Sequence, residues 1–241
     1  MNSKRSSDTT PVELVAPDAR LLFSPDSGRR RTYRVGELVR ERDIPYDEVE
    51  VVREGWLFSY ASLADGRRQV LRLYLAGDII GLDSMPHRRA AYDVEAGTPA
   101  TVSVHPKEKL GMLFAHRSPG AELLWRIAFY WQHSTLDRLT ALGRFNAAER
   151  LLHLYLHLHD RLSVRGEIDG EGFFAVPLTQ DVIGDAVGLT NVYVSRMLAK
   201  LKELGGLERR GHRFRLLDVD AIRGSPSFAR LAAFRRFSGA G

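Results

Sequence analysis

The sequence of 241 residues contains no cysteine. That absence excludes disulfide scaffolds, thiolate-bound iron–sulfur clusters, cysteine-ligated zinc and cysteine nucleophiles. Long hydrophobic runs are lacking too, because stretches such as LYLAGDII and LGMLFA fall far short of the ~20 apolar residues that cross a bilayer. The N-terminal MNSKRSSDTT has no apolar segment after its basic residues, so no secretory signal is expected. We therefore expect a cytoplasmic protein that makes no contact with a membrane.

Catalytic signatures are missing as well. The chain has no phosphate-binding P-loop, no nucleophile elbow, no HExxH metal motif and no carboxylate pair at a suggestive spacing, so an enzyme is not expected. What is present is a globular composition, with 44% hydrophobic and 27% charged residues and a net charge of +5. This mild basic excess is compatible with nucleic acid but too small to identify it.

Short runs of alternating polar and apolar residues, broken by Gly and Asp, occupy residues 32–105. Such spacing predicts an antiparallel sandwich or barrel. Within it, Asp65-Gly66 predicts a hairpin turn, because Gly tolerates a positive φ. Residues 1–20 are rich in Ser, Thr, Pro and charge and predict a loose arm, with the first ordered element near Leu21. We interpret the run Arg29-Arg30-Arg31 as a solvated loop, a second phosphate contact being the alternative.

A long helix is predicted after the β-rich half. Ser118 and Pro119 suit its N-cap and first position, and apolar residues continue at helical spacing to Leu142. One stripe of it is predicted to be the seam on which two copies of the chain pair: Leu124, Ala128, Trp131, Thr135 and Leu142. The alternative is that this stripe packs on the β-rich domain. A second helix is predicted from Asn146, where Glu149 completes a capping box, to about Leu162.

The C-terminal third predicts a helix-turn-helix followed by a basic hairpin. Thr179 can cap a first helix, Gly188 permits the turn, and Thr190 can cap a second helix over residues 191–204. The segment LERRGHRFRLL then predicts a hairpin around Gly211-His212 that carries four arginines against one Glu. A wing lying on a phosphate backbone would have this composition.

The outward residues of this region divide into two predicted sets. Those at the start of the second helix are expected to read base edges of double-stranded DNA: Asn191, Val192, Ser195 and Arg196. Those expected to hold the DNA backbone are Thr179, Gln180, Tyr193, Lys200, Arg209, Arg210 and Arg213. Val192 can offer only apolar contact, for example to a thymine methyl, whereas Arg196 can grip a guanine or a phosphate.

The stretch LTQDVIGDAVGLTNVYVSRMLAKLKELGGL resembles, without a gap, the winged helix-turn-helix of the Crp/Fnr regulators. The N-terminal half is similar to the cyclic-nucleotide-binding-like β-roll of that family through GELV, REGWLFSY, DGRRQVLRLYLAGDIIG and AGTPATVSV, in that order. The resemblance covers residues 32–220 and implies a β-roll, a long dimerisation helix and a DNA-binding domain. It also implies a homodimer on double-stranded DNA, and RNA polymerase could be a further partner.

The sequence departs from the family at the residues that would bind a cyclic nucleotide. Where members that bind cyclic AMP carry a Glu for the ribose and an Arg-Ser pair for the phosphate, this chain has Leu82, Ala90 and Ala91. Leu and Ala cannot make those polar contacts, so cyclic AMP is not expected to bind unless Arg88 or Arg89 reaches into the pocket. The missing cysteines exclude the iron–sulfur cluster of other members.

Two histidines and the C-terminal tail are the remaining features. His153 and His157 stand at i and i+4, a spacing that could bind a metal or supply a haem ligand. We interpret both as partly exposed helix residues, so neither a metal nor haem is expected, and the effector stays open. The tail FARLAAFRRF is basic and amphipathic, and packing on the DNA-binding domain or fraying is favoured over membrane contact.

These features predict an α+β protein with an antiparallel, jelly-roll-like β-roll, a long dimerisation helix and a C-terminal winged helix-turn-helix. Its predicted function is that of a homodimeric, sequence-specific transcription regulator that recognises an interrupted palindrome. The alternative is a ligand-binding or protein-interaction signalling module with a degenerate helix-turn-helix. The expected division is an arm at 1–20, a sensor β-roll at 21–117, the dimerisation helix at 118–143, the DNA-binding domain at 144–222 and a tail at 223–241.

Overall fold

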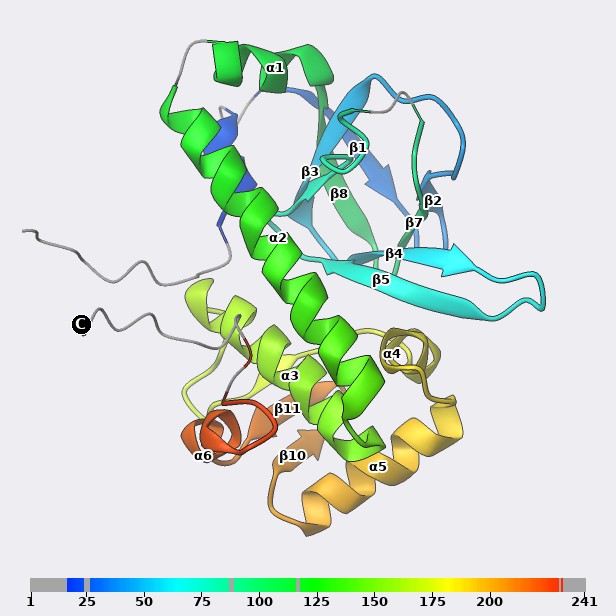
Figure 1. Cartoon of the computed structure of the whole chain (residues 1–241), viewed down its shortest axis with the longest axis vertical. Coiled ribbons are helices and arrows are strands. Elements are labelled where there is room, and N and C mark those ends of the chain that lie inside the picture. The colour runs from blue at the N-terminus through cyan, green and yellow to red at the C-terminus, as the bar shows by residue number, and fades with distance from the viewer. Residues whose placement is uncertain (1–16, 24–26, 87–88, 116–117, 230, 232–241) are drawn as a thin grey trace, which may run out of the picture.

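The computed structural model describes residues 17–23, 27–86, 89–115, 118–229 and 231. A β-rich part lies at one end and a mainly helical part at the other, and the long helix α2 runs past both (Figure 1). The N-terminal elements are η1 (Ala19–Leu22), β1 (Arg29–Tyr33), β2 (Leu38–Arg40), β3 (Glu48–Glu54), β4 (Leu57–Ser62), β5 (Arg68–Tyr74), β6 (Ile79–Ile80), β7 (Asp93–Ala96), β8 (Ala100–Pro106) and α1 (Lys107–Ala115).

Two antiparallel sheets form the β-roll, as the sequence predicts. One has the strand order β1-β8-β3-β6 and the other β2-β7-β4-β5. Apolar side chains from both sheets, such as Val52, Leu57 and Val102, are fully buried in one cluster between them. The predicted hairpin joins β4 to β5, with Gly66 at a φ of +83°.

The N-terminal segment corrects two predictions. Arg29–Arg31 is not a loop but part of β1, which pairs with β8, and Arg29 and Arg31 lie 3.2 and 3.0 Å from carboxylate oxygens of Glu48. The element expected near Leu21 is η1, which contains that residue, and it takes in the end of the predicted arm, because Asp18 caps η1 and Ala19 is completely buried. The prediction of a loose arm is therefore wrong for these last residues, and residues 1–16 lie outside the described part of the chain.

Helix α2 (Pro119–Arg144) begins where the sequence predicts, with Ser118 at the N-cap and proline at the first position. It is followed by α3 (Ala147–Val164), whose capping box of Asn146 and Glu149 is present as predicted. None of the helices among the described residues is both long enough and apolar enough to cross a bilayer.

The predicted seam of α2 faces inward. Leu124 is 1% exposed and Trp131 7% exposed, and both belong to a cluster that packs α2 against the β-roll. Their assignment to a dimer interface is therefore wrong, because the alternative of packing on the β-rich domain holds for these two side chains. Ala128 and Leu142 are partly buried and Thr135 is exposed.

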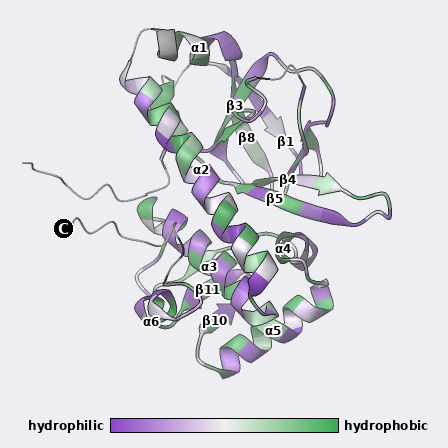
Figure 2. Cartoon of the chain, in the orientation of Figure 1, coloured by the Kyte–Doolittle hydropathy of each residue, from purple (hydrophilic) through white to green (hydrophobic). Residues whose placement is uncertain are grey.

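Another face of α2 carries the exposed apolar side chains. Hydrophobic and hydrophilic residues alternate along the whole of the helix (Figure 2). The large apolar side chains that remain exposed are Trp125, Phe129, Leu136 and Leu139, at 55, 48, 51 and 66%. We refer to these four residues as the outer stripe of α2.

The C-terminal part consists of β9 (Phe174–Ala175), α4 (Gln180–Val187), α5 (Asn191–Glu203), β10 (Leu207–Arg210), β11 (Arg213–Leu216) and α6 (Val219–Gly224). It shares one continuous core with the β-roll, since Phe58 and Val70 of the β4–β5 hairpin join the cluster that fills the C-terminal part. Phe228, in the tail, is also buried there and packs against Phe145. The described part of the tail thus packs on the helical part; the rest of the predicted amphipathic segment lies outside the described residues.

Candidate nucleic-acid interface

Helices α4 and α5 form the predicted helix-turn-helix. The hydroxyl of Thr179 accepts a hydrogen bond from the Val182 N–H at 3.3 Å, which caps α4, and Gly188 turns the chain with a φ of +67°. The backbones meet closely at Gly184, where a Cβ atom would lie 2.4 Å from the Leu189 carbonyl oxygen. Only glycine can occupy that position without moving the turn.

Burial divides α5 into two faces. The inner face packs into the core through Val194, Met197, Leu198 and Leu201. All four predicted base-reading residues lie on the exposed side, and Val192 has 76% of its surface exposed near the N-terminal end of the helix. In the free protein, the apolar side chain of Val192 is therefore in contact with water. Apolar contact with a thymine methyl group is the kind of base contact that valine can make.

Helix α4 orients two of the predicted reading residues. Asn191 donates from its amide nitrogen to Asp181 at 2.7 Å, and the Ser195 hydroxyl donates to the side chain of Gln180. Gln180, predicted to hold the DNA backbone, therefore holds Ser195 in the free protein. Arg196 instead lies over the Tyr193 ring, 4.9 Å from its centre. Within the described part of the chain it pairs with no carboxylate.

Strands β10 and β11 form the predicted wing around Gly211, which has a φ of +65°, and β9 adds a third strand to the sheet. Two acidic residues that the sequence analysis missed approach it from the loop before β9. Glu171 lies 2.7 Å from Arg210, and Asp169 pairs with Arg213. The run GEIDGEG was the available signal, but only the fold places it beside the wing.

These ion pairs change the charge that the wing offers. Arg210 also pairs with Glu208, and Arg215 pairs with the same carboxylate. Arg209 differs, because it donates to the Gly211 carbonyl at 2.9 Å and pairs with no carboxylate among the described residues. Among these four arginines, Arg209 could meet an external anion without first losing an ion pair, whereas Arg210, Arg213 and Arg215 would have to exchange a carboxylate for it.

The sequence matches two known domain families at places that agree with this fold: a cyclic nucleotide-binding domain over residues 30–117 and a Crp-like helix-turn-helix domain over residues 148–224. The chain belongs to the Crp/Fnr family. The anaerobic regulatory protein of Haemophilus influenzae is 24% identical over 194 residues, which cover 80% of this chain and 75% of that protein.

Other relatives agree with this assignment. The transcriptional activator protein FnrA of Stutzerimonas stutzeri is 26% identical over 190 residues, covering 79% of this chain and 77% of that protein. The structure of FixK2 from Bradyrhizobium japonicum is 28% identical, with a TM-score of 0.71 over 82% of this chain and 96% of that chain. This Crp/Fnr protein is thus a transcription regulator with a helix-turn-helix domain. The relatives confirm that it is not an enzyme.

The β-roll of this Crp/Fnr regulator holds an internal ion pair where family members can bind a cyclic nucleotide. Ala90 and Ala91 line a small pocket into which Arg40 projects. The Arg40 guanidinium lies 2.6 Å from Glu50, both side chains are at most 1% exposed, and a Cβ atom at Gly81 would lie 2.5 Å from Arg40. Burial raises the pKa of Glu50 even though Arg40 opposes that shift. The Arg40 guanidinium thus lies in this pocket and is paired with a carboxylate of the protein itself.

The other residues considered for a cyclic nucleotide point elsewhere. Leu82 packs in the cluster between the β-roll and α2. Arg89 is exposed and donates to the Asp43 carbonyl at 2.5 Å, whereas Arg88 lies outside the described residues.

Of the two helical histidines, His153 is more buried than predicted, whereas His157 is partly exposed as predicted. His153 is 6% exposed and packs against Phe145 and Phe228 in the core, and His157 stacks on Tyr130. Among the described residues, no group of three His, Asp or Glu side chains could hold a metal ion. Burial lowers the pKa of His153 from 6.5 to about 4, and Arg138 contributes to the same shift.

Buried His153 predicts a loss of stability in mild acid. Its pKa is lower in the folded than in the unfolded chain, so the unfolded chain binds the proton first and stability falls as pH drops from about 6.5 towards 4. Between pH 7 and pH 5 the wild type should lose up to roughly 2 kcal/mol more than the His153→Phe variant. Urea unfolding at both pH values measures this, with His153→Gln as a second neutral variant; parallel pH profiles for all three proteins would contradict it.

Proposed function

We propose that two copies of this regulator pair through the outer stripe of α2 and bind an interrupted palindrome in the cytoplasm. The exposed N-terminal half of α5 carries this proposal, because it presents an amide, a hydroxyl, a methyl-bearing side chain and a guanidinium side by side. Such a set can distinguish bases in a major groove. Two-fold symmetry would place two α5 helices about 34 Å apart, one helical turn of DNA.

The spacing of the outer stripe supports a helix pair. Trp125, Phe129, Leu136 and Leu139 follow steps of four, seven and three residues, which match a heptad seam with Gln132 between them. Trp125 and Phe129 also stack with their ring centres 5.5 Å apart. A second copy of α2 would cover four large apolar side chains that the monomer leaves in water.

The matched domain families support a β-roll sensor ending near residue 117 and a DNA-binding domain beginning near residue 147, with α2 between them. We propose that the DNA-binding domain ends at Gly224, where α6 and the second match both end. This is two residues beyond the boundary expected from the sequence.

One observation favours the alternative of a signalling module with a degenerate helix-turn-helix. The ion pairs of Arg210, Arg213 and Arg215 reduce the free positive charge of the wing. Binding-site selection from random DNA decides between the two functions, because a module of the second kind would enrich no motif.

Variants of base-reading residues and of backbone-contact residues should affect DNA binding in different ways. Replacing Arg196 by Ala should cost about 1–3 kcal/mol of specific binding and change the preference at one or two positions of the half-site. Replacing Arg209 by Ala should weaken binding to all sequences alike and flatten the salt dependence by roughly 0.9 for the lost phosphate contact. Arg213→Ala should have the smaller effect, because its ion pair with Asp169 must first break.

Selection with the wild type and each variant, followed by salt titration on the selected site, measures both effects. Lys202, exposed on α5 and outside the predicted contacts, supplies the matched control as Lys202→Ala. A motif changed by Arg209→Ala but not by Arg196→Ala would mean that the wing reads the sequence.

A further inference from the structure

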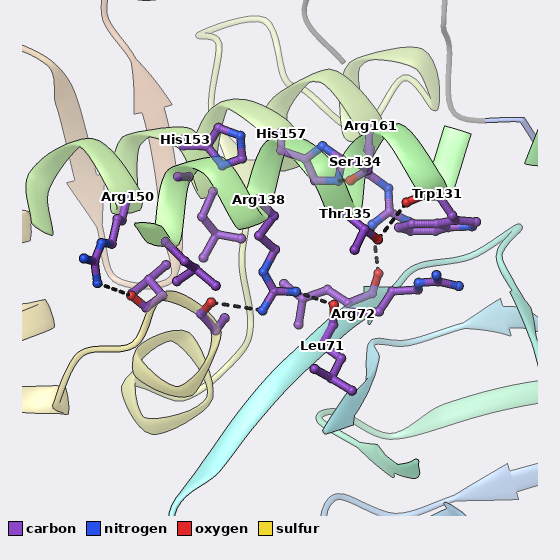
Figure 3. Close-up of a pocket in the computed structure, with 16 residues that line it drawn as sticks. Leu71, Arg72, Trp131, Ser134, Thr135, Arg138, Arg150, His153, His157 and Arg161 are labelled. Carbon is purple, nitrogen blue, oxygen red and sulfur yellow. Dashed lines mark hydrogen bonds between the residues drawn. The ribbon is translucent and has the colours of Figure 1, made fainter. Parts of the chain in front are cut away.

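A second, larger pocket lies outside the β-roll interior, where β5, α2, α3 and α4 meet (Figure 3). Its empty space is about 630 Å³, part of which is open to solvent. Each of the structural units of the regulator contributes to the wall: the sensor sheet, the long helix and the helix-turn-helix. A ligand bound here would contact all three at once.

The wall carries positive charge without acidic residues. Arg72, Arg138, Arg150 and Arg161 line the pocket, and none of the other described lining residues is Asp or Glu. Asp78, which is not a lining residue, pairs with Arg161 and also with Arg165 outside the pocket. Among the described residues no carboxylate pairs with the other three arginines. Desolvated positive charge of this kind favours an anion.

Arg138 shows the imbalance most clearly. Its guanidinium donates to the carbonyl oxygens of Leu71 and Val70 on β5, and to that of Ala186 on α4 at 3.0 Å. Figure 3 shows it between the two elements. Burial lowers the pKa of Arg138 to about 10, and nearby Arg72 contributes to that shift. The Arg138 guanidinium thus has three neutral carbonyl oxygens as its acceptors, and a negatively charged acceptor would bind it more strongly.

Arg161 adds an unsatisfied donor in the same wall. Its side chain is 1% exposed, and its Nε atom is buried with no hydrogen-bond partner. Such a group costs free energy unless something fills the site. Apolar side chains line the pocket beside the arginines, with Trp131, Leu142 and Leu154 among them. The Trp131 ring lies against Arg72 and Arg161, whose guanidinium carbons are 4.4 and 4.8 Å from its centre. The site therefore offers cationic and apolar side chains together.

We propose that this interdomain pocket binds a small organic anion, a carboxylate, sulfonate or phosphate on an aromatic or branched aliphatic body, and that this anion is the effector of the regulator. The effector role rests on the proposed DNA-binding function, whereas binding itself does not. A carboxylate competes for Arg138 more strongly than the Ala186 carbonyl does. Binding therefore loosens the contact between α4 and β5 and shifts the population of DNA-competent arrangements.

The test compares 1-naphthaleneacetate with its neutral analogue 1-naphthaleneethanol by calorimetry on the full chain without DNA. The anion should bind at least about tenfold more tightly than the alcohol. Arg72→Gln and Arg150→Gln should each remove most of that preference, and Leu142→Trp should block both compounds by filling the pocket. Arg72 donates to no backbone carbonyl among the described residues, so its variant should keep the fold even if Arg138→Gln does not. Arg30→Gln, on the exposed part of β1, is the matched control.

Equal binding of the anion and the alcohol overturns the proposal, as does an equal loss in Arg30→Gln. Failure of both 1-naphthaleneacetate and phenyl phosphate to bind at millimolar concentration also overturns it. The effector role is read separately, as a change in affinity for the selected DNA site on adding 1-naphthaleneacetate. Binding without that change overturns the effector role, whereas wild-type protein that selects no DNA site either with or without 1-naphthaleneacetate refutes only the proposed function.

Discussion

The double variant Phe129→Glu, Leu139→Glu is expected to be a folded monomer that no longer binds its operator at nanomolar concentration. Both side chains are exposed in the single chain, at 48 and 66%, so the substitutions should not disturb its core. Across a two-fold axis they would bury four carboxylates without partners, which costs far more than a dimer of this size can supply. Losing the second recognition helix should reduce operator affinity by at least about a hundredfold.

Sedimentation velocity and a gel shift on the selected palindrome measure the two effects. Leu63→Glu is the matched control, since Leu63 is 50% exposed on the β4–β5 hairpin and lies outside the outer stripe. The control should stay dimeric and bind DNA normally. A dimer that survives the double substitution would exclude the outer stripe as the interface.

The sequence predicted the secondary structure of this protein better than its surfaces. Helix ends were predictable because Ser118, Asn146, Thr179 and Thr190 are local signals, and the β-roll hairpin was predictable from Gly66 for the same reason. The orientation of α2 was not. Apolar residues lie on two of its faces, and periodicity alone cannot tell the face that contacts the β-roll from the face left in water. Trp131 was assigned to the wrong one.

The site shows the same division between local and distant information. The exposed residues of α5 followed from its amphipathic pattern, whereas two carboxylate partners of the wing arginines come from a distant loop, in which Glu171 stands 39 residues before Arg210. The four arginines of the interdomain pocket belong to β5, α2 and α3. Only tertiary packing brings such residues together, so no motif in the sequence could have indicated the pocket.

Asp78→Ala is expected to destabilise the protein by about 3–5 kcal/mol. Asp78 follows Gly77 in the turn before β6, yet its carboxylate forms a buried ion pair with Arg161 of α3 and lies 3.6 Å from Arg165. It also accepts the Leu75 N–H at 2.7 Å. Removing it would leave the Arg161 guanidinium, 1% exposed, without a counter-charge at the junction between the β-roll and the helical part.

A double variant shows how much of this loss comes from leaving the Arg161 charge unpaired and how much from losing the ion pair itself. Asp78→Leu combined with Arg161→Met replaces both charges by apolar groups, and it should recover more than half of the stability that Asp78→Ala loses. The Arg161 charge, the more deeply buried of the two, is then absent, and only Arg165 loses its carboxylate. Asp83→Ala, at an exposed position in the following turn, should change the free energy of unfolding by less than about 0.5 kcal/mol. Urea unfolding of the four proteins measures this. If the double variant were no more stable than Asp78→Ala, the carboxylate would act through the Leu75 N–H and the turn it closes rather than through the charge of Arg161.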